Sequence, residues 1–245
     1  KLFCDGNELT SLPELPNSLT ELTCEDNKLT SLPALAKLNS LIILYCSYNP
    51  LTSLPILPDS LTELICEDNQ LTFLPTLPKS LTELHCNVNQ LTTLPALIKL
   101  KSLTELTCNA NQLIGIPALP NSLTELSCNA NQLTALPALP NSLNKLSCNA
   151  NQLTALPALP NSLTELSCNN NELRTLPALP NSLLVLDCDT KLHRFLTPAQ
   201  LQRLRIPTAN APAVNAMQVH QEFAKLNIPA ILAFFQSQQI PPPPS

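Results

Sequence analysis

The sequence predicts an α/β solenoid, in which units of about 20 residues stack into one curved parallel β-sheet on a concave face. Ten cysteines recur at intervals of 20 or 22 residues, from Cys4 to Cys188, and no cysteine lies outside this series. An asparagine follows each of the first nine cysteines by three residues. Such a period is typical of proteins in which each unit contacts only its neighbours and the core runs through the whole stack.

Each unit is predicted to begin with a short strand that carries one buried face. Leu64 and Cys66 lie two positions apart, which is the side-chain period of a strand, so both are expected to point into the interior. Glu63, Ile65 and Glu67 alternate with them and are expected to face solvent. Cysteine in this column would serve as a small apolar side chain.

The second half of each unit is predicted to be an extended return on the convex side. Pro75 and Pro78 exclude regular helix from this segment and favour polyproline-like backbone. Two returns, residues 34–40 and 96–102, lose the second proline and gain two residues, so we expect a helical turn in each.

The asparagines are predicted to have a structural role. The chain turns sharply into the core after each strand, and buried backbone groups at such a bend need hydrogen-bond partners. An asparagine side chain supplies two donors and one acceptor to adjacent units. The residues that represent the two structural columns are Cys66, Cys86, Cys128, Asn69, Asn89 and Asn131.

The cysteines are expected to be reduced packing groups, because parallel Cβ vectors in adjacent units are poor geometry for a disulfide. This predicts a reducing compartment. No Cys-x-x-Cys pair is present, and burial among leucines would raise the pKa of the thiols, so no metal site is expected. With two glycines in the whole chain, no glycine-rich phosphate loop exists, and we expect no cofactor and no catalytic residue.

The frame Leu-x-x-Leu-x-Cys-x-x-Asn-x-Leu-x-x-Leu-Pro-x-Leu-Pro-x-Ser resembles the leucine-rich repeat consensus. The length of 20 residues and the Leu-Pro-x-Leu-Pro return resemble the bacterial effector subclass typified by YopM, IpaH and SspH proteins, although that subclass more often has an aliphatic residue in place of cysteine. Some members carry a ubiquitin-ligase domain with a catalytic cysteine after the repeats. Residues 189–245 contain no cysteine, so the resemblance does not extend to that domain.

Three regions are expected along the chain: a solenoid at 1–192, a helical C-terminal cap at 193–238 and a flexible proline-rich tail at 239–245. Thr197 followed by Pro198 is a helix start signal. A separate helical unit that docks a partner is the alternative to a cap. The chain opens directly in strand residues, which predicts that it is a fragment of a longer protein.

Charge and hydropathy limit the partners. The formal net charge of −5 and the isoelectric point near 5.2 disfavour nucleic acid and anionic membranes. No apolar run approaches the ~20 residues that span a bilayer. We therefore expect a monomer that binds protein.

The N-terminal half of the exposed strand face is predicted to bind a partner, because aromatic and apolar side chains are surrounded there by carboxylates. From about residue 104 to 170 the face repeats one pattern of Glu or Lys, Ser or Thr, and Asn, which predicts no distinctive pocket. The alternative is that Tyr45 and Ile65 only pack against each other on a solvated sheet. The candidate residues are Ile43, Tyr45, Tyr48, Glu63, Ile65, Glu67, Asp68, Glu83 and His85.

The resemblance and the acidic face together predict a non-enzymatic bacterial effector, secreted into the host cell cytoplasm, that binds a host protein with a basic surface. The glutamates would serve solubility equally well. Two other functions stay open: the substrate-recognition arm of a larger enzyme such as an E3 ubiquitin ligase, and a surface or self-assembling structural protein.

Overall fold

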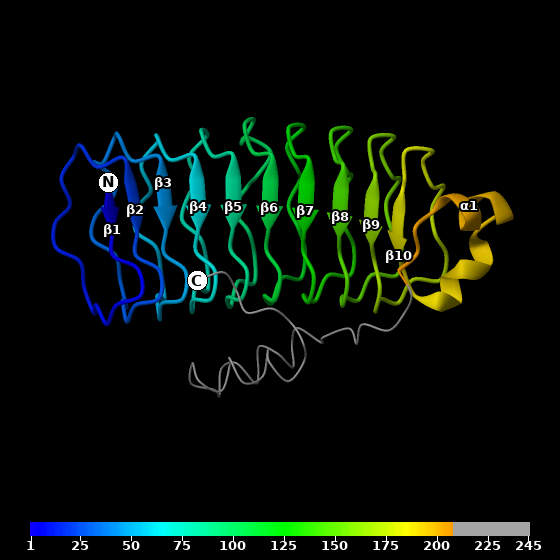
Figure 1. Ribbon diagram of the computed structural model, residues 1–245, viewed down its shortest axis with the longest axis horizontal. Helices are drawn as coiled ribbons and strands as arrows, with labels where there is room; N and C mark the ends of the chain where they lie inside the picture. The colour runs from blue at the N-terminus through cyan, green and yellow to red at the C-terminus, as the bar shows by residue number, and fades with distance from the viewer. Residues whose placement is uncertain (208–245) are drawn as a thin grey trace. The chain divides into compact units, whose positions relative to one another are not determined.

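The computed structural model describes residues 1–207, which form a solenoid built on one parallel sheet of ten strands in sequential order (Figure 1). All the strands are short, and the turns between them run behind the sheet. The strands are β1 (Leu2–Phe3), β2 (Glu21–Thr23), β3 (Ile43–Tyr45), β4 (Glu63–Ile65), β5 (Glu83–His85), β6 (Glu105–Thr107), β7 (Glu125–Ser127), β8 (Lys145–Ser147), β9 (Glu165–Ser167) and β10 (Val185–Asp187).

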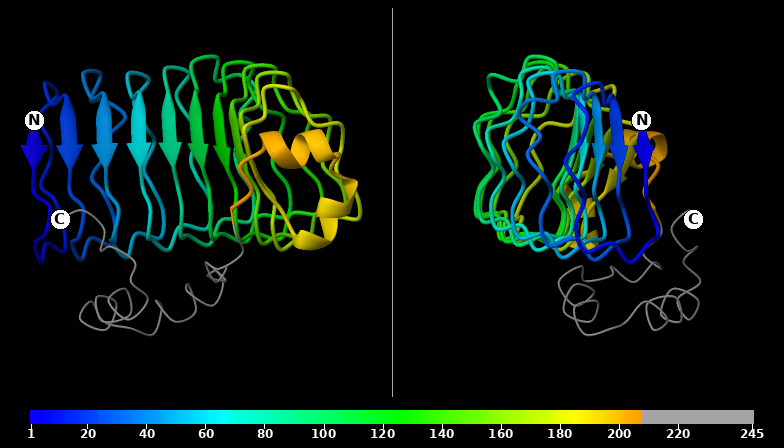
Figure 2. Two further views of the ribbon diagram at one scale, coloured as in Figure 1. Left: turned by 45° about the vertical axis from the view of Figure 1, so that its right-hand side comes forward. Right: turned by 90° about the vertical axis from the view of Figure 1, so that its left-hand side faces the viewer.

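The strands pair in register, so equivalent residues of successive turns lie side by side. Leu44 of β3 stands opposite Leu64 of β4, and the residues that flank them are aligned in the same way. In the end-on view of Figure 2, the middle turns are displaced from the end turns, away from the side that carries the strands. The strand face of residues 1–207 is therefore the concave one, as the sequence predicts.

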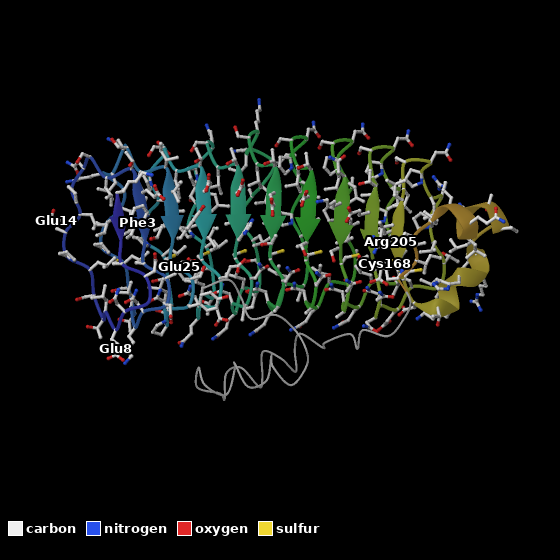
Figure 3. All side chains as sticks on the ribbon, in the orientation of Figure 1. Phe3, Glu8, Glu14, Glu25, Cys168 and Arg205 are labelled. Atoms are coloured by element: carbon white, nitrogen blue, oxygen red, sulfur yellow. The ribbon has the colours of Figure 1, made fainter. Side chains whose placement is uncertain are left out.

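Leucines and cysteines fill one continuous interior. In the fourth turn Leu64, Cys66 and Leu71 have no exposed surface, and Leu74 and Leu77 are also buried. The buried residues of all turns form a single hydrophobic cluster from Leu15 to Leu204. All ten cysteines are free; one of them, Cys168, is labelled in Figure 3.

The returns contain no helix and no strand within residues 1–189. The expected helical turns at 34–40 and 96–102 are not formed: each segment makes two consecutive tight turns instead. In the first of them the amide of Leu38 donates to the carbonyl of Leu35 at 2.9 Å, and the amide of Leu41 donates to the carbonyl of Leu38 at 2.8 Å. Leu38 is 2% exposed, so the two extra residues bring one more leucine into the core rather than extending a helix.

The asparagine after each strand bonds to two turns at once. The amide nitrogen of Asn69 lies 3.1 Å from the carbonyl oxygen of Cys46 in the preceding turn, and it also reaches the carbonyls of Cys66 and Glu67 in its own turn. Its Oδ1 accepts from the backbone amide of Leu51 at 3.1 Å. Asn89 and Asn131 repeat these contacts in their turns.

The bend places the residue before each of these asparagines in the left-handed region, with φ of 49° at Asp68 and 52° at Val88. This conformation is costly for a β-branched residue such as valine. The asparagine contacts therefore hold a backbone shape that most of these residues would not adopt alone.

A second set of hydrogen bonds lies on the opposite side of the solenoid, where the sequence analysis assigned no role. The hydroxyl of Ser60 donates to the carbonyl of Leu41 at 2.7 Å, and that of Ser80 donates to the carbonyl of Leu61 at 2.6 Å. Ser122, Ser142, Ser162 and Ser182 make the same contact one turn back. The serines thus add a second set of hydrogen bonds between successive turns.

After β10 the chain forms a 3₁₀ helix, η1 (Thr190–Phe195), and one α-helix, α1 (Pro198–Arg203). Thr197 caps α1, and Gln200 reaches back to the amide of Thr197. The amide of Arg205 donates to the carbonyl of Leu184, and the amide of Leu186 donates to the carbonyl of Arg205.

The other helices expected within 193–238 and the proline-rich tail at 239–245 lie outside the described residues. None of the helices found in residues 1–207 combines the length and the apolar character needed to cross a bilayer.

Candidate functional site

The nine candidate residues lie on three adjacent turns of the concave face, those of β3, β4 and β5. We call this set the N-terminal patch: Ile43, Tyr45, Tyr48, Glu63, Ile65, Glu67, Asp68, Glu83 and His85. The strand register aligns Tyr45, Ile65 and His85 in one row across the sheet. It aligns Ile43, Glu63 and Glu83 in the neighbouring row. Residues separated by 40 positions in the chain are therefore brought onto one continuous surface.

Tyr45 is held in place by its neighbours. Its hydroxyl donates to Oε2 of Glu63 at 2.6 Å, and its side chain is half-buried. Burial raises the pKa of Tyr45 well above the usual range, and the hydrogen bond and charge of Glu63 raise it further, followed by the charges of Glu83 and Glu21. The phenol is therefore neutral at physiological pH, and its hydrogen bond to Glu63 restrains the side chain.

Tyr48 and Asp68 lie at the bend that follows the strands, not on the strands themselves. Both have left-handed backbone, with φ of 55° and 49°. Tyr48 is 47% exposed. Burial of the rest of its side chain raises the pKa of Tyr48, with smaller contributions from the charges of Asp68, Glu67, Glu25 and Asp26. Tyr48 is thus an accessible aromatic group at the rim of the patch.

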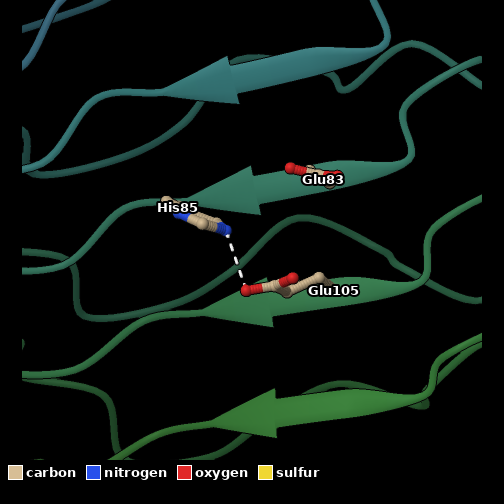
Figure 4. A group of neighbouring side chains, drawn as sticks. All are labelled: Glu83, His85 and Glu105. Carbon is tan, nitrogen blue, oxygen red and sulfur yellow. Dashed lines mark ion pairs between the residues drawn. The ribbon is translucent and has the colours of Figure 1, made fainter.

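A histidine, His85, lies among three carboxylates at the other end of the patch, and Figure 4 shows it with two of them, Glu83 and Glu105. Nε2 of His85 lies 3.1 Å from Oε1 of Glu105, and Nδ1 lies 3.8 Å from Oε1 of Glu67. Glu83 completes the cluster: one ligand atom each from Glu83, His85 and Glu105 lie within 4.8 Å of one another. Glu105 was not among the predicted site residues. Its alignment with Glu83 in the row beside His85 is the sequence signal that identifies it.

The residues that directly follow the cysteines are less exposed than the strand pattern predicts. The pattern predicts that they face solvent, but Ser47 is only 1% exposed and its hydroxyl oxygen accepts from the amide of Glu67. Oδ1 of Asn109 accepts from the amide of Asn129 at 2.7 Å, and the next turns repeat this bond. These polar side chains form a further column of hydrogen bonds between successive turns, in addition to the column of buried asparagines. Glu67, the patch residue at this position, is half-buried, so it offers a partner less surface than a fully exposed side chain would.

A shallow hollow of about 260 Å³ lies over β6–β9, where the repeated pattern predicted no distinctive pocket. The hollow has a simple steric cause. The last position of each strand holds Thr107, Ser127, Ser147 and Ser167 here, whereas the N-terminal patch has Tyr45, Ile65 and His85 at the same position. Small side chains leave a depression beside the column that contains Glu125 and Lys145, which form an ion pair at 2.8 Å.

The buried thiols are poor candidates for nucleophiles. Burial raises the pKa of Cys108 to about 12 and that of Cys66 well above the usual range. Both side chains have no exposed surface. The sulfur of Cys66 instead lies 3.6 Å from the carbonyl oxygen of His85 in the next strand, a weak contact that adds to the packing.

Comparison with known proteins places the chain among repeat proteins. The family described as "Leucine Rich repeats (2 copies)" matches residues 17–59 and 79–121. A search of curated proteins gave no match.

Two solved structures are informative. YopM from Yersinia enterocolitica WA-314 is 37% identical over 74% of this chain, with a TM-score of 0.62, and this chain spans 44% of YopM. A Shigella effector LRR domain is 34% identical over 64% of this chain and 76% of that domain, with a TM-score of 0.52.

Proposed function

We propose that this chain, which belongs to the leucine-rich repeat proteins of the bacterial effector type, is a non-enzymatic module that binds a host protein through its concave strand face. Solenoids of this kind use the extended concave surface for binding. The similarity to YopM and to the Shigella effector domain supports an effector role. The chain spans less than half of YopM, so the partner is argued from this chain's own surface.

The observation that carries the proposal is the placement of Tyr45, Tyr48 and Ile65 among carboxylates on adjacent turns. Aromatic anchors of this kind dominate the energy of protein interfaces. Three strands about 4.8 Å apart and six residues of about 3.3 Å each give a patch of roughly 290 Å². A specific interface covers about 800 Å² on each partner. The N-terminal patch would thus be the energetic centre, and the partner would extend over neighbouring turns.

The charge of the face favours a basic partner. Glu63, Glu83, Glu105 and Glu125 are aligned in consecutive strands, so like charges stand one strand apart. Each neighbouring pair repels by about 1 kcal/mol or less in water. A lysine-rich or arginine-rich surface would relieve this repulsion and accelerate association.

The proposal is tested by replacing the anchors and measuring capture of partners from host-cell lysate. We expect the variant Tyr45→Ala/Tyr48→Ala/Ile65→Ser to bind its partner at least 10-fold more weakly, because each lost hot spot costs about 2 kcal/mol or more of binding free energy. The matched control is Ile56→Ser/Phe73→Ser/Ile114→Ser, which removes exposed apolar groups outside the patch. If the control loses the partner and the patch variant retains it, the concave patch is not the binding site.

A second function is favoured by the similarity to a protein described as an effector LRR domain. On this alternative the solenoid is the substrate-recognition arm of a larger enzyme, such as an E3 ubiquitin ligase. The full reading frame distinguishes the two: a downstream helical domain with a cysteine supports the alternative, and its absence supports the stand-alone module.

We also propose that the protein works as a monomer in a reducing compartment, the host cell cytoplasm, and that residues 193–238 form a helical cap at the end of the 1–192 solenoid. The ten free cysteines support the first part. The burial of Leu196 and Leu204 in the common core supports the second. The tail at 239–245 is proposed to be a flexible extension.

A further inference from the structure

The cluster at the end of the N-terminal patch has the ligand chemistry of a metal site. We propose that Glu83, His85 and Glu105 bind a divalent transition-metal ion such as Zn²⁺ on the concave face. One ligand atom from each residue lies within 4.8 Å of the other two. Figure 4 shows the imidazole of His85 on β5 directed toward the carboxylate of Glu105 on β6.

The distances suit a tetrahedral ion. Bonds of about 2.0–2.1 Å from Zn²⁺ to nitrogen and oxygen place two ligands about 3.3 Å apart. Nε2 of His85 and Oε1 of Glu105 are already 3.1 Å apart. Glu83 would supply the third ligand, because one of its carboxylate oxygens lies within 4.8 Å of the other two ligand atoms, and the fourth position would face solvent.

The ring nitrogen of His85 supports this assignment independently of the carboxylates. Nε2 is buried, yet it has no hydrogen-bond partner among residues 1–207, although Glu105 lies close to it. Buried polar atoms are normally satisfied. When the imidazole is neutral and Nε2 is unprotonated, Nε2 and Oε1 of Glu105 direct lone pairs at the same place, and a cation fits there.

A carboxylate behind the ring adds a further feature of metal sites. Nδ1 of His85 faces Oε1 of Glu67 at 3.8 Å, and Glu67 is itself held by the amide of Asn87. Histidines that ligate metals commonly turn the other ring nitrogen toward a carboxylate, which fixes the tautomer and strengthens the ligand. Here that arrangement would leave Nε2 free to ligate.

Electrostatics and ligand type together select the ion. Glu67, Glu83 and Glu105 concentrate negative charge around one imidazole, and a divalent cation would neutralise most of it. Imidazole favours zinc, copper, iron and nickel, whereas calcium and magnesium prefer oxygen ligands alone. Among the ten strands of residues 1–207, β5 alone carries histidine at its last position, so the site belongs to this turn and not to the repeat in general.

The test measures metal binding directly and does not depend on the proposed partner. Purified protein in its reduced state is titrated with Zn²⁺ by calorimetry, and with Co²⁺ by absorption spectroscopy. We expect one saturable site, with the visible bands of Co²⁺ bound by nitrogen and oxygen and without the near-ultraviolet charge-transfer band of a thiolate. A thiolate band would show that the cysteines bind the metal and would overturn the proposal.

The key variant is His85→Thr, because threonine already occupies the equivalent position in β6. We expect it to fold normally and to lose at least 100-fold in Zn²⁺ affinity. Glu67→Gln should still bind Zn²⁺ but with about 10-fold lower affinity, as is typical when a carboxylate that supports a ligating histidine is lost. Glu165→Gln, in the same row on β9, is the control and should bind normally. Unchanged affinity in His85→Thr would contradict the proposal, as would a wild-type protein without a saturable site.

Discussion

At the scale of single residues, the buried asparagine makes the most concentrated contribution. Asn131 is 8% exposed, and its side chain contacts three carbonyl oxygens and one amide hydrogen from two turns. Hydrogen bonds of this kind give a modest net gain, but a buried group without a partner costs about 1–3 kcal/mol. Removing this asparagine is therefore expected to cost more stability than the net gain of its hydrogen bonds alone would suggest.

We expect Asn131→Ala to lower the free energy of unfolding by about 2–4 kcal/mol, because the amide of Leu113 and the carbonyl of Cys108 would lose partners inside the stack. Urea denaturation followed by circular dichroism measures the change. Asn121→Ala removes an exposed asparagine and should cost less than about 0.5 kcal/mol. Equal decreases in the free energy of unfolding of the two variants would mean that the hydrogen bonds of the buried asparagines do not stabilise the fold.

At the scale of elements, no strand or return is stable by itself. The strands are two or three residues long, and their order comes from pairing with both neighbours and from the leucines beneath them. The same shortness leaves each three-residue strand only its first and last side chains on the concave face. The size of the last side chain decides whether the surface is filled, as at Tyr45, or hollow, as at Ser127.

Helix α1 depends on its N-terminal contacts in a similar way. Thr197 accepts from the amide of Gln200, and the side chain of Gln200 accepts from the amide of Thr197. We expect Thr197→Ala to destabilise this segment by about 1 kcal/mol. Hydrogen exchange should then be faster at residues 198–204 and unchanged in β3–β5. Uniformly faster exchange throughout residues 1–207 would show that the helix is coupled to the whole solenoid.

At the scale of the molecule, the cysteine column makes the free energy of unfolding fall as the pH becomes alkaline. Burial raises the pKa of Cys108 to about 12, and burial raises the pKa of the other cysteines as well. The unfolded chain titrates near the ordinary thiol pKa of about 8.5. The folded state therefore keeps protons that the unfolded state releases. The resulting stability is complete below about pH 8.5 and is lost as pH rises toward 12.

We expect the melting temperature to fall steeply between pH 8 and pH 10 in the presence of a reducing agent. At pH 10, Cys108 alone would account for a loss of about 1.4–2 kcal/mol. The variant Cys108→Ala should be less stable at neutral pH, but its dependence on pH should be shallower by that amount. A melting temperature that stays constant from pH 7 to pH 10 would contradict the burial of the thiols.

The sequence by itself determined the repeat, the parallel sheet, the inward direction of Leu64 and Cys66, and the contacts that an asparagine such as Asn69 makes at the bend. These features follow from local spacing that every turn repeats, so one unit is enough to predict them.

The tertiary structure decided what neighbouring turns do to one another. It removed Ser47 from the solvent face, opened the hollow over β6–β9 and placed Glu105 beside His85. The physical reason is that these contacts join side chains about 20 residues apart, and their geometry depends on the register and curvature of the stack. A repeat pattern states which positions align, but side-chain size and rotation decide which atoms meet.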